Sequence, residues 1–402
     1  MKLHRNLVEA VVRNLQLIFA DGKYADKVIE KSLASNKRWG ARDRGFIAET
    51  TYEMVRWWRL LLYLGQTDDE MISDKKLWRL VGIWHVLNDQ GLPSWEEFTG
   101  IKSGDVQRFF EKAKKIRKVK QSIPDWLDEI GEKELGEEWD KELNALNRQA
   151  QVIIRVNTLK TTKAELQRLL FAEEIETATL DGITDGLVLK KRINIFTTPH
   201  FKNGFFEIQD AASQLVAPFL QVDENMRVVD ACAGAGGKTL HLASLMENKG
   251  KILALDVEDW KLTELKKRTR RNGIENVENR LIENNKTIKR MQNSADRLLL
   301  DVPCSGLGVL RRNPDAKWKL DIDFINSIKN TQQEILQTYT QILKKGGKFV
   351  YATCSILPSE SEDQVKKFLT EHKGEFELED EQRISPSQSG FDGFYMARVV
   401  RK

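Results

Sequence analysis

Cysteines are the residues of this chain best suited to covalent chemistry, and each of the three follows an apolar run. Cys304 follows residues 297–302, Cys354 follows residues 347–353, and Cys232 follows residues 228–231. An apolar run that ends at polar residues is typical of a buried parallel strand, and open α/β sheets bind their ligands at the carboxyl ends of such strands. We therefore expect a functional site where these strand ends meet.

Two of the thiols are candidates for nucleophilic catalysis. A thiolate can add to C6 of a pyrimidine and leave C5 nucleophilic, and a second thiol nearby could then help to remove the C5 proton and expel the enzyme. Buried cysteines are more often inert, but Cys304 and Cys354 lie beyond strand ends in polar turns, which favours catalysis. Cys232 lies inside a glycine-rich loop, where packing is the favoured role.

The glycine-rich loop, residues 230–239, joins the first of these strands to a helix, so its backbone amides can approach a ligand closely. A phosphate-binding P-loop is disfavoured because Cys232 stands where the first glycine is needed, and an NAD loop needs glycine or alanine where Thr239 stands. S-adenosylmethionine asks for a looser turn and an acid for its ribose hydroxyls, and Asp256 ends the next strand. A turn without a ligand would use the same glycines, so the loop alone does not decide.

Composition indicates an ordinary globular protein of two or three domains. The 402 residues contain 64 Lys and Arg against 60 Asp and Glu, and a net charge of +4 is too small by itself to indicate nucleic acid. The chain start lacks the apolar core of a signal, no run approaches a membrane span, and the cysteines and five histidines show no metal-ligand spacing. We expect a cytoplasmic protein with free thiols, no membrane contact and no metal.

Periodicity predicts the domains. Helical spacing runs through residues 1–145, short strands and one helix indicate a small α/β subdomain over residues 146–205, and residues 206–402 form the catalytic domain. Strands are expected near 227–231, 251–257, 279–283, 297–302 and 347–353, and helices near 238–247, 259–272, 322–344 and 361–370. This α/β alternation predicts a doubly wound, Rossmann-like parallel sheet, to which residues 394–400 could add an edge strand.

Several motifs together resemble the RNA cytosine-C5 methyltransferase family, typified by the bacterial ribosomal small-subunit methyltransferase B. They are Asp301-Val-Pro-Cys-Ser-Gly306, Thr353-Cys-Ser355, Arg155-Val-Asn-Thr-Leu-Lys160, Ile208-Gln-Asp-Ala-Ala-Ser-Gln214 and the glycine-rich loop. The resemblance covers residues 148–402, and residues 1–145 resemble the NusB-like RNA-binding domain of these enzymes more loosely. It implies methylation of C5 of a cytosine in RNA, above all ribosomal RNA, with S-adenosylmethionine as donor; we expect a monomer.

The resemblance also assigns roles to residues. Cys354 is implied as the nucleophile, Cys304 as the thiol that assists release, and Asp301 as the carboxylate that holds the cytosine edge and stabilises charge on N3, with Lys238 beside it. The residues expected to bind the cofactor are Asp230, Cys232, Ala233, Gly234, Ala235, Gly236, Gly237, Lys238, Asp256, Lys261, Glu283, Asn284 and Asp301. The residues expected to contact RNA are Arg155, Asn157, Lys160, Gln209, Asp210, Arg311 and Arg312.

The sequence departs from the family pattern, and other functions stay open. The glycine-rich loop lacks the family's usual proline, which leaves backbone access intact. Where the family often has Glu-Asn-Glu, this chain has Glu360-Ser-Glu362, and Ser359 with Glu362 is expected to form a capping box. The alternatives are a DNA cytosine-C5 methyltransferase, which would use Cys304 as its nucleophile, and an RNA-binding ribosome assembly factor without catalysis.

Overall fold

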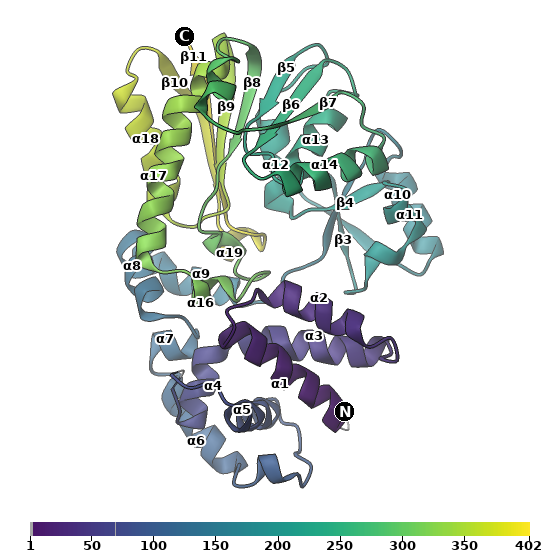
Figure 1. The fold of residues 1–402 in the computed structure, drawn as a ribbon, viewed down its shortest axis with the longest axis vertical. Helices are drawn as coiled ribbons and strands as arrows, with labels where there is room; N and C mark the ends of the chain where they lie inside the picture. The colour runs from purple at the N-terminus through teal and green to yellow at the C-terminus, as the bar shows by residue number, and fades with distance from the viewer. Residues whose placement is uncertain (1–2, 69) are drawn as a thin grey trace. The chain divides into compact units, whose positions relative to one another are not determined.

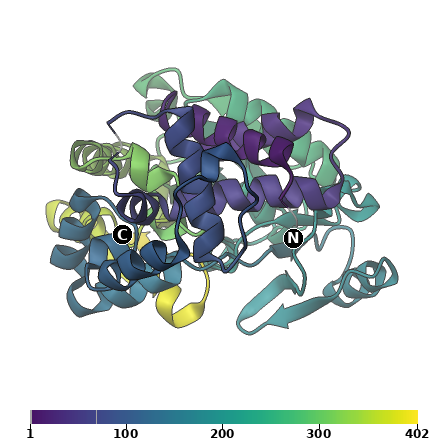
Figure 2. The same ribbon diagram turned by 90° about the horizontal axis from the view of Figure 1, so that it is seen from below.

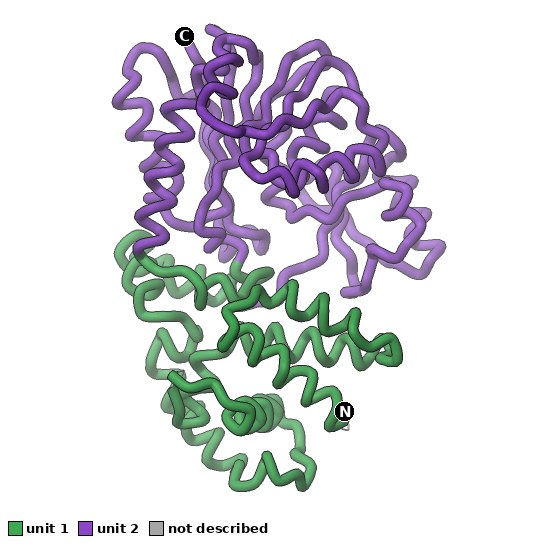
Figure 3. The backbone as a smooth tube through the Cα atoms, in the orientation of Figure 1, with its two compact units in different colours: residues 1–147, 310–322 green, residues 148–309, 323–402 purple. Residues whose placement is uncertain are grey.

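The structure is a computed structural model that describes residues 3–68 and 70–402 of the chain. It separates into two compact units (Figure 3). One unit consists of the chain up to Asn147 together with Leu310–Ile322, and the other consists of Arg148–Val309 and Asp323–Lys402. None of the helices in the described ranges is long and apolar enough to cross a membrane.

The first unit is helical, as its periodicity predicts. Its helices are α1 (Arg5–Phe19), α2 (Ala25–Ser35), α3 (Ala41–Arg56), α4 (Trp58–Gly65), α5 (Asp74–Leu87), η1 (Glu96–Phe98), α6 (Ser103–Ala113), α7 (Arg117–Lys120), α8 (Asp125–Leu135), η2 (Gly136–Glu138) and α9 (Trp139–Leu146). Residues three and four apart share a helix face, so Val8, Val11 and Leu15 of α1 are all fully buried. Phe19 stacks on Trp58 with ring centroids 3.7 Å apart, and α1 runs beside α3 (Figure 2).

Residues 310–322, which include α16 (Ala316–Lys319), belong to this helical unit although they follow the Cys304 motif in sequence. Arg56 donates to the carbonyl of Arg311 at 3.0 Å, and Lys317 Nζ donates to the carbonyl of Arg56 at 2.9 Å. Lys317 is 2% exposed and Arg311 is 6% exposed. Burial therefore removes Arg311 from the RNA-facing surface expected for it, whereas Arg312 stays partly exposed.

A small four-stranded antiparallel sheet begins the second unit. It contains β1 (Ile153–Val156), α10 (Lys163–Ala172), β2 (Thr177–Leu180), β3 (Ile183–Leu189), η3 (Ile195–Thr197), α11 (Pro199–Lys202) and β4 (Phe206–Ile208), with strand order β2-β3-β1-β4. The sequence pattern predicts strands over 152–158, 186–189 and 205–208 and a helix over 162–171, and β1, β3, β4 and α10 lie there. β2 was not expected, because its side chains are partly exposed and show no alternation.

The main sheet has the order β10-β11-β9-β8-β5-β6-β7 and confirms the doubly wound α/β fold. Its strands are β5 (Arg227–Asp230), β6 (Lys251–Asp256), β7 (Val277–Leu281), β8 (Ala295–Asp301), β9 (Leu343–Thr353), β10 (Phe376–Ile384) and β11 (Phe394–Arg401). The five strands from β9 to β7 are parallel, and β11 runs antiparallel between β9 and β10. The expectation that residues 394–400 form an edge was wrong, since β10 takes that place.

Helices cover both faces of this sheet (Figure 1). They are α12 (Ala211–Phe219), α13 (Gly237–Leu245), α14 (Asp259–Asn272), α15 (Asn285–Lys289), α17 (Ile322–Tyr339), α18 (Glu362–Glu371) and the short α19 (Pro386–Ser389), with the 3-10 turns η4 (Leu307–Val309), η5 (Thr340–Ile342) and η6 (Pro358–Glu360). Strand residues alternate between the faces: Leu299 packs with α12 and α13, whereas Leu298 and Leu300 pack with α15, α17 and α18. Adjacent β5, β8 and β9 thus end at one edge between two helical layers.

Candidate active site

The two predicted catalytic thiols meet at this edge of the sheet. Cys304 follows β8, Cys354 follows β9, and their Sγ atoms lie 3.2 Å apart. Both side chains are half-buried and free of disulfides. The hydrogen bond with Cys354, and then burial, raise the pKa of the Cys304 thiol well above its usual value. Cys304 therefore stays a protonated donor near neutral pH, which suits a group that assists the sulfur of Cys354.

A lysine and a carboxylate lie beside the thiols. Lys238 stands in the first turn of α13, Asp301 ends β8, and Nζ of Lys238 lies 2.7 Å from Oδ2 of Asp301. The ammonium also lies 4.9 Å from the centroid of the Phe394 ring. This contact holds the Asp301 carboxylate in one position, so the pair presents a fixed carboxylate to whatever enters the cavity.

One cavity joins the thiols to this ion pair. It has a volume of about 350 Å³ and is lined by Asp210, Ser213, Lys238, Asp301, Val302, Pro303, Cys304, Val309, Cys354, Asp392 and Phe394. Its lining combines the aromatic ring of Phe394, the two thiols and the charged pair of Lys238 and Asp301. Such a concave site is suited to a small planar ring that is held by its polar edge and attacked by a thiol.

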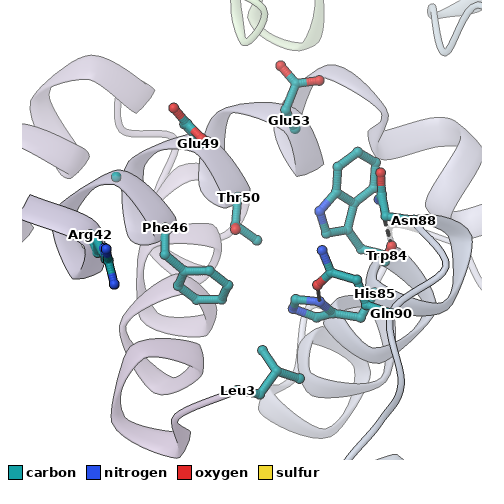
Figure 4. Close-up of a pocket in the computed structure, with 11 residues that line it drawn as sticks. Leu3, Arg42, Phe46, Glu49, Thr50, Glu53, Trp84, His85, Asn88 and Gln90 are labelled. Atoms are coloured by element: carbon teal, nitrogen blue, oxygen red, sulfur yellow. Dashed lines mark hydrogen bonds between the residues drawn. The ribbon is translucent and has the colours of Figure 1, made fainter. Parts of the chain in front are cut away.

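A second cavity, of about 490 Å³, lies within the helical unit (Figure 4). Phe46 and His85 stand on opposite sides of it, and Nδ1 of His85 lies 2.7 Å from Oε1 of Gln90. Burial lowers the pKa of His85, so the ring is neutral at neutral pH. This cavity is the larger of the two, but its lining contains no cysteine or lysine. Covalent chemistry therefore belongs to the thiol cavity.

The glycine-rich loop connects β5 to α13 and leaves polar groups ready for a ligand. Oδ2 of Asp230 accepts a hydrogen bond from the Thr239 hydroxyl at 2.7 Å, whereas its buried Oδ1 has no partner among the described residues. Burial raises the pKa of Asp230 to about 7. Gly234 N–H donates to Oδ2 of Asp256 at 2.9 Å, which ties the loop to the end of β6.

The remaining residues predicted to bind the cofactor border this loop. Lys261 Nζ lies 4.0 Å from Asp256 Oδ1 and 2.8 Å from Glu258 Oε1. Glu283 and Asn284 follow β7 and are exposed, and the Asn284 side chain caps α15. Asp230 has an unpaired carboxylate oxygen among the described residues, and Asp256 lies beside Lys261 at the open loop. These groups fit a cationic ligand that carries ribose hydroxyls, so they agree with S-adenosylmethionine. In the described part of the chain, no group of three or more metal-ligating side chains occurs.

Most of the side chains predicted to contact RNA have scaffold positions instead. Arg155 donates to Gln209 Oε1 and to the carbonyl of Gly237, and Asn157 donates to the carbonyls of Gly204 and Asn272. Arg155 is 2% exposed and Asn157 is 3% exposed. These buried donors satisfy backbone carbonyls between the small sheet and the main sheet, so the direct RNA contacts expected for them are not available.

Three more of the seven residues predicted to contact RNA, namely Lys160, Gln209 and Asp210, have mixed positions. Lys160 Nζ donates to the carbonyls of Asn203 and Arg271 at 2.8 and 2.7 Å, although part of it stays exposed. Gln209 is 8% exposed and donates to Ser213 Oγ. Asp210 caps α12 and lines the thiol cavity, so it is the one that can face a substrate there.

Sequence reasoning missed Glu360. The sequence shows it only as part of the Glu360-Ser-Glu362 motif, beside a capping box predicted from Ser359 and Glu362. In the structure Ser361 is the N-cap of α18 without a side-chain cap, and Glu362 pairs with Arg383. Glu360 is fully buried and hydrogen-bonds to the serines that follow both catalytic-site cysteines. Its spacing from Cys354 in the chain was the available signal.

Comparisons with known proteins identify the family of the chain. Residues 217–400 match the family model described as 16S rRNA methyltransferase RsmB/F, and residues 123–196 match the ferredoxin-like domain of RsmF/B-like methyltransferases. The probable ribosomal RNA small subunit methyltransferase B of Synechocystis is 36% identical over 63% of this chain and 57% of its own. The ribosomal RNA small subunit methyltransferase B of Pseudomonas putida is 31% identical over 70% of this chain and 67% of its own.

A solved structure extends the match to the whole chain. The crystal structure of PH0851 superposes with a TM-score of 0.84 at 25% identity and covers 100% of both chains. The chain nevertheless spans less than two thirds of the length of the first curated relatives, with 57%, 66% and 65% covered. The two family models, the curated relatives and the thiol cavity lead to one assignment: the chain belongs to the RsmB/F family of 16S rRNA methyltransferases.

Proposed function

We propose that this protein transfers a methyl group from S-adenosylmethionine to C5 of a cytosine in ribosomal RNA. The observation that carries the proposal is the cavity in which the sulfur atoms of Cys304 and Cys354 lie 3.2 Å apart beside the Lys238–Asp301 pair. Family membership and the names of the relatives support ribosomal RNA as the substrate class. We place the enzyme in the cytoplasm, acting as a monomer.

The chain's own residues perform the covalent steps. The Cys354 thiolate attacks C6 of the cytosine, a C6–S bond forms, and the electron pair of the C5–C6 double bond moves onto C5 and toward N3. Asp301 binds the polar edge of the ring, and Lys238 holds that carboxylate in place. When bound, S-adenosylmethionine supplies the methyl group that C5 takes up. Loss of the C5 proton to a base then restores the double bond as the C6–S bond breaks.

Cys304 assists both when Cys354 attacks the cytosine and when it is released. With a raised pKa, its thiol donates a hydrogen bond to the Cys354 sulfur, which stabilises that sulfur as an attacking and as a departing thiolate. Residues of the glycine-rich loop, Asp230 and Asp256 hold the cofactor. The orphaned Oδ1 of Asp230 gives its cationic part a counter-charge, and Asp256 accepts from its ribose.

The target base must be unpaired and unstacked to enter the site. Cytosine has to leave its stack before C6 can meet Cys354, so single-stranded or loop segments are the substrates. We further propose the division into a NusB-like RNA-binding domain over residues 1–145, a small α/β subdomain over 146–205 and a catalytic domain over 206–402. In that division residues 310–322 are a catalytic-domain loop that packs within the helical unit.

A methyl-transfer assay tests the function. Purified protein is incubated with methyl-labelled S-adenosylmethionine and either naked small-subunit RNA, assembled small subunits, transfer RNA or DNA, and the labelled nucleotide is identified after digestion. We expect 5-methylcytosine in ribosomal RNA alone. Label in DNA would support the DNA-methyltransferase alternative, and cofactor binding without any labelled nucleotide would support an assembly factor. Cys354→Ala is the matched inactive control.

A further inference from the structure

Glu360 is a fully buried carboxylate that connects the turns following both cysteines. Its Oε1 accepts hydrogen bonds from the hydroxyls of Ser305 at 2.5 Å and Ser355 at 2.6 Å. Its Oε2 accepts from the Ser305 backbone N–H at 2.8 Å and from Gln332 Nε2 at 3.1 Å. Because each serine directly follows a cysteine of the site, one side chain is bonded to both reactive loops.

The two turns have the same internal geometry. Ser305 Oγ accepts from the backbone N–H of Leu307 at 3.3 Å, and Ser355 Oγ accepts from the backbone N–H of Leu357 at 3.1 Å. Each hydroxyl oxygen is thus fixed by its own turn, and its proton points to Glu360. The carboxylate joins the two turns through their side chains, beside the direct contact of the two hydroxyls at 3.3 Å and the backbone bond from Gly308 N–H to the Cys354 carbonyl at 2.9 Å.

The Glu360 carboxylate matches its surroundings in a way that an amide would not. Four neutral donors fill its acceptor positions, so a terminal NH₂ group in the same place would face donors instead of acceptors. The backbone is also fixed, since the Tyr351 hydroxyl donates to the Glu360 carbonyl at 2.7 Å. A buried carboxylate costs more to desolvate than a neutral group of the same shape, so packing alone does not require one.

We propose that Glu360 is a positioning residue that sets the distance between the two reactive thiols. By holding Ser305 and Ser355 together, its carboxylate keeps the loops after β8 and β9 in contact and the sulfur atoms of Cys304 and Cys354 at 3.2 Å. Catalysis depends on such placement, because small displacements of reacting groups lower rates strongly. The catalytic consequence rests on the proposed function, but the geometric consequence does not.

Disulfide trapping tests the geometry without any assay of methylation. Diamide takes two electrons and two protons from the thiols: two S–H bonds break, one S–S bond forms between Cys304 and Cys354, and the N=N bond of diamide is reduced to a hydrazine. Peptide mapping gives the rate. We expect Glu360→Gln to slow trapping by roughly tenfold or more, because the joined turns separate. Ser305→Ala and Ser355→Ala each remove one of the two hydroxyl bonds to the carboxylate and should slow trapping less.

Matched variants separate positioning from damage to the fold. Glu362→Gln changes a neighbouring carboxylate that pairs with Arg383 at 2.6 Å and should trap at the wild-type rate. Thermal unfolding identifies variants that fail to fold. Should Glu360→Gln prove unfolded, the two serine variants and their double variant carry the test, and their effects should be less than additive because both bonds end on one carboxylate. Wild-type trapping rates in folded Glu360→Gln, or in both serine variants, would overturn the proposal.

Methyl transfer supplies the second readout. We expect Glu360→Gln to lower kcat by about 10- to 100-fold with little change in KM for RNA, and Glu360→Asp to recover part of the loss. A merely structural role would instead lower the fraction of active enzyme and leave the turnover of the folded fraction unchanged. If the wild-type protein transfers no methyl group, the proposed function fails while trapping still decides on Glu360. Slow trapping with unchanged kcat would overturn its catalytic part.

Discussion

The sulfur atoms of Cys304 and Cys354 lie 3.2 Å apart although 50 positions separate the residues in the chain. The parallel pairing of β8 and β9 produces this proximity, since Asp301 lies opposite Ala352 and each cysteine follows within three residues. A second contact fixes the loops, because Gly308 N–H donates to the carbonyl of Cys354 at 2.9 Å. A Cβ on Gly308 would lie 2.2 Å from the carbonyl oxygen of Gly393, so only glycine allows this approach.

Replacing each cysteine separately should show which thiol attacks the cytosine and which one assists release of the product. With RNA that carries 5-fluorocytosine at the target, no C5 proton can be removed, so the C6–S adduct persists and is visible on a denaturing gel. Cys354→Ala should form no adduct and lose more than about 10³-fold in kcat, because no nucleophile remains. Cys304→Ala should still form this adduct, and on unmodified RNA it should release the methylated product slowly. Loss of the adduct with Cys304→Ala alone would reverse the two roles.

Lys238→Met should lower turnover more than it lowers substrate binding. The ammonium lies 2.7 Å from Asp301 and also helps to keep the pKa of Asp230 from rising further. Without it two carboxylates face each other uncompensated, and Asp301 loses its fixed position. We expect kcat to fall by roughly 100-fold and Lys238→Arg to retain more activity, measured by labelled methyl transfer. An unchanged kcat in Lys238→Met would remove Lys238 from the machinery.

Two glycines of the same loop should respond differently to alanine. Gly236 has φ +88°, and a Cβ there would lie 2.6 Å from Leu265 Cγ, so Gly236→Ala should lower the free energy of unfolding by about 2–4 kcal/mol. Gly234 has φ +54° with no atom within 4 Å of such a Cβ, so Gly234→Ala should cost only about 1 kcal/mol. Denaturant unfolding measures both.

Gly234→Ala should affect cofactor binding more than it affects stability. The open space at Gly234 faces the ligand in our proposal, so a methyl group there should weaken S-adenosylmethionine binding by roughly tenfold, measured by calorimetry. Wild-type affinity in a folded Gly234→Ala variant would mean that this part of the loop does not contact the cofactor.

The strand ends could be predicted from the sequence because each apolar run stops where the polar and reactive residues begin. The apolar stretch before Asp301 and the one before Cys354 have the length and composition of buried parallel strands, and the α/β alternation predicts the doubly wound sheet that contains them. β10 could not be found in this way, since its residues are mostly charged and exposed and a charged edge strand has the composition of a loop. The pattern therefore predicts the interior strands better than the edge.

Polar residues show a second limit of prediction. Arg155 and Asn157 stand in a family motif beside strand ends, and a sequence cannot tell whether such donors face RNA or satisfy backbone carbonyls; the structure shows the latter. Lys317 lies in a segment whose composition is typical of a solvated loop, but its side chain is buried in the helical unit. Glu360 resembles an exposed acid near a helix start. In each case the partners lie far away in the chain, and local periodicity carries no information about them.

The free energy of unfolding should depend on pH through His241. This residue of α13 is 3% exposed, and neither ring nitrogen has a hydrogen-bond partner among the described residues. Burial, reinforced by the positive charge of Arg155, lowers the pKa of His241 from 6.5 to about 4, so its approach to Asp185 at 3.6 Å is not an ion pair at neutral pH. Between these two pH values the unfolded chain binds the extra proton and the folded chain does not.

Stability should therefore rise with pH from about 4 to 6.5 and be lost as pH falls through that window, by up to about 3 kcal/mol for this group. Asp230 acts in the opposite direction, because its raised pKa lets the folded state hold a proton longer. The difference between wild type and His241→Gln, measured by urea unfolding at several pH values, isolates the histidine. His4→Gln, which changes an exposed histidine, serves as the control. A His241→Gln curve parallel to wild type would mean that the ring is protonated in the folded protein.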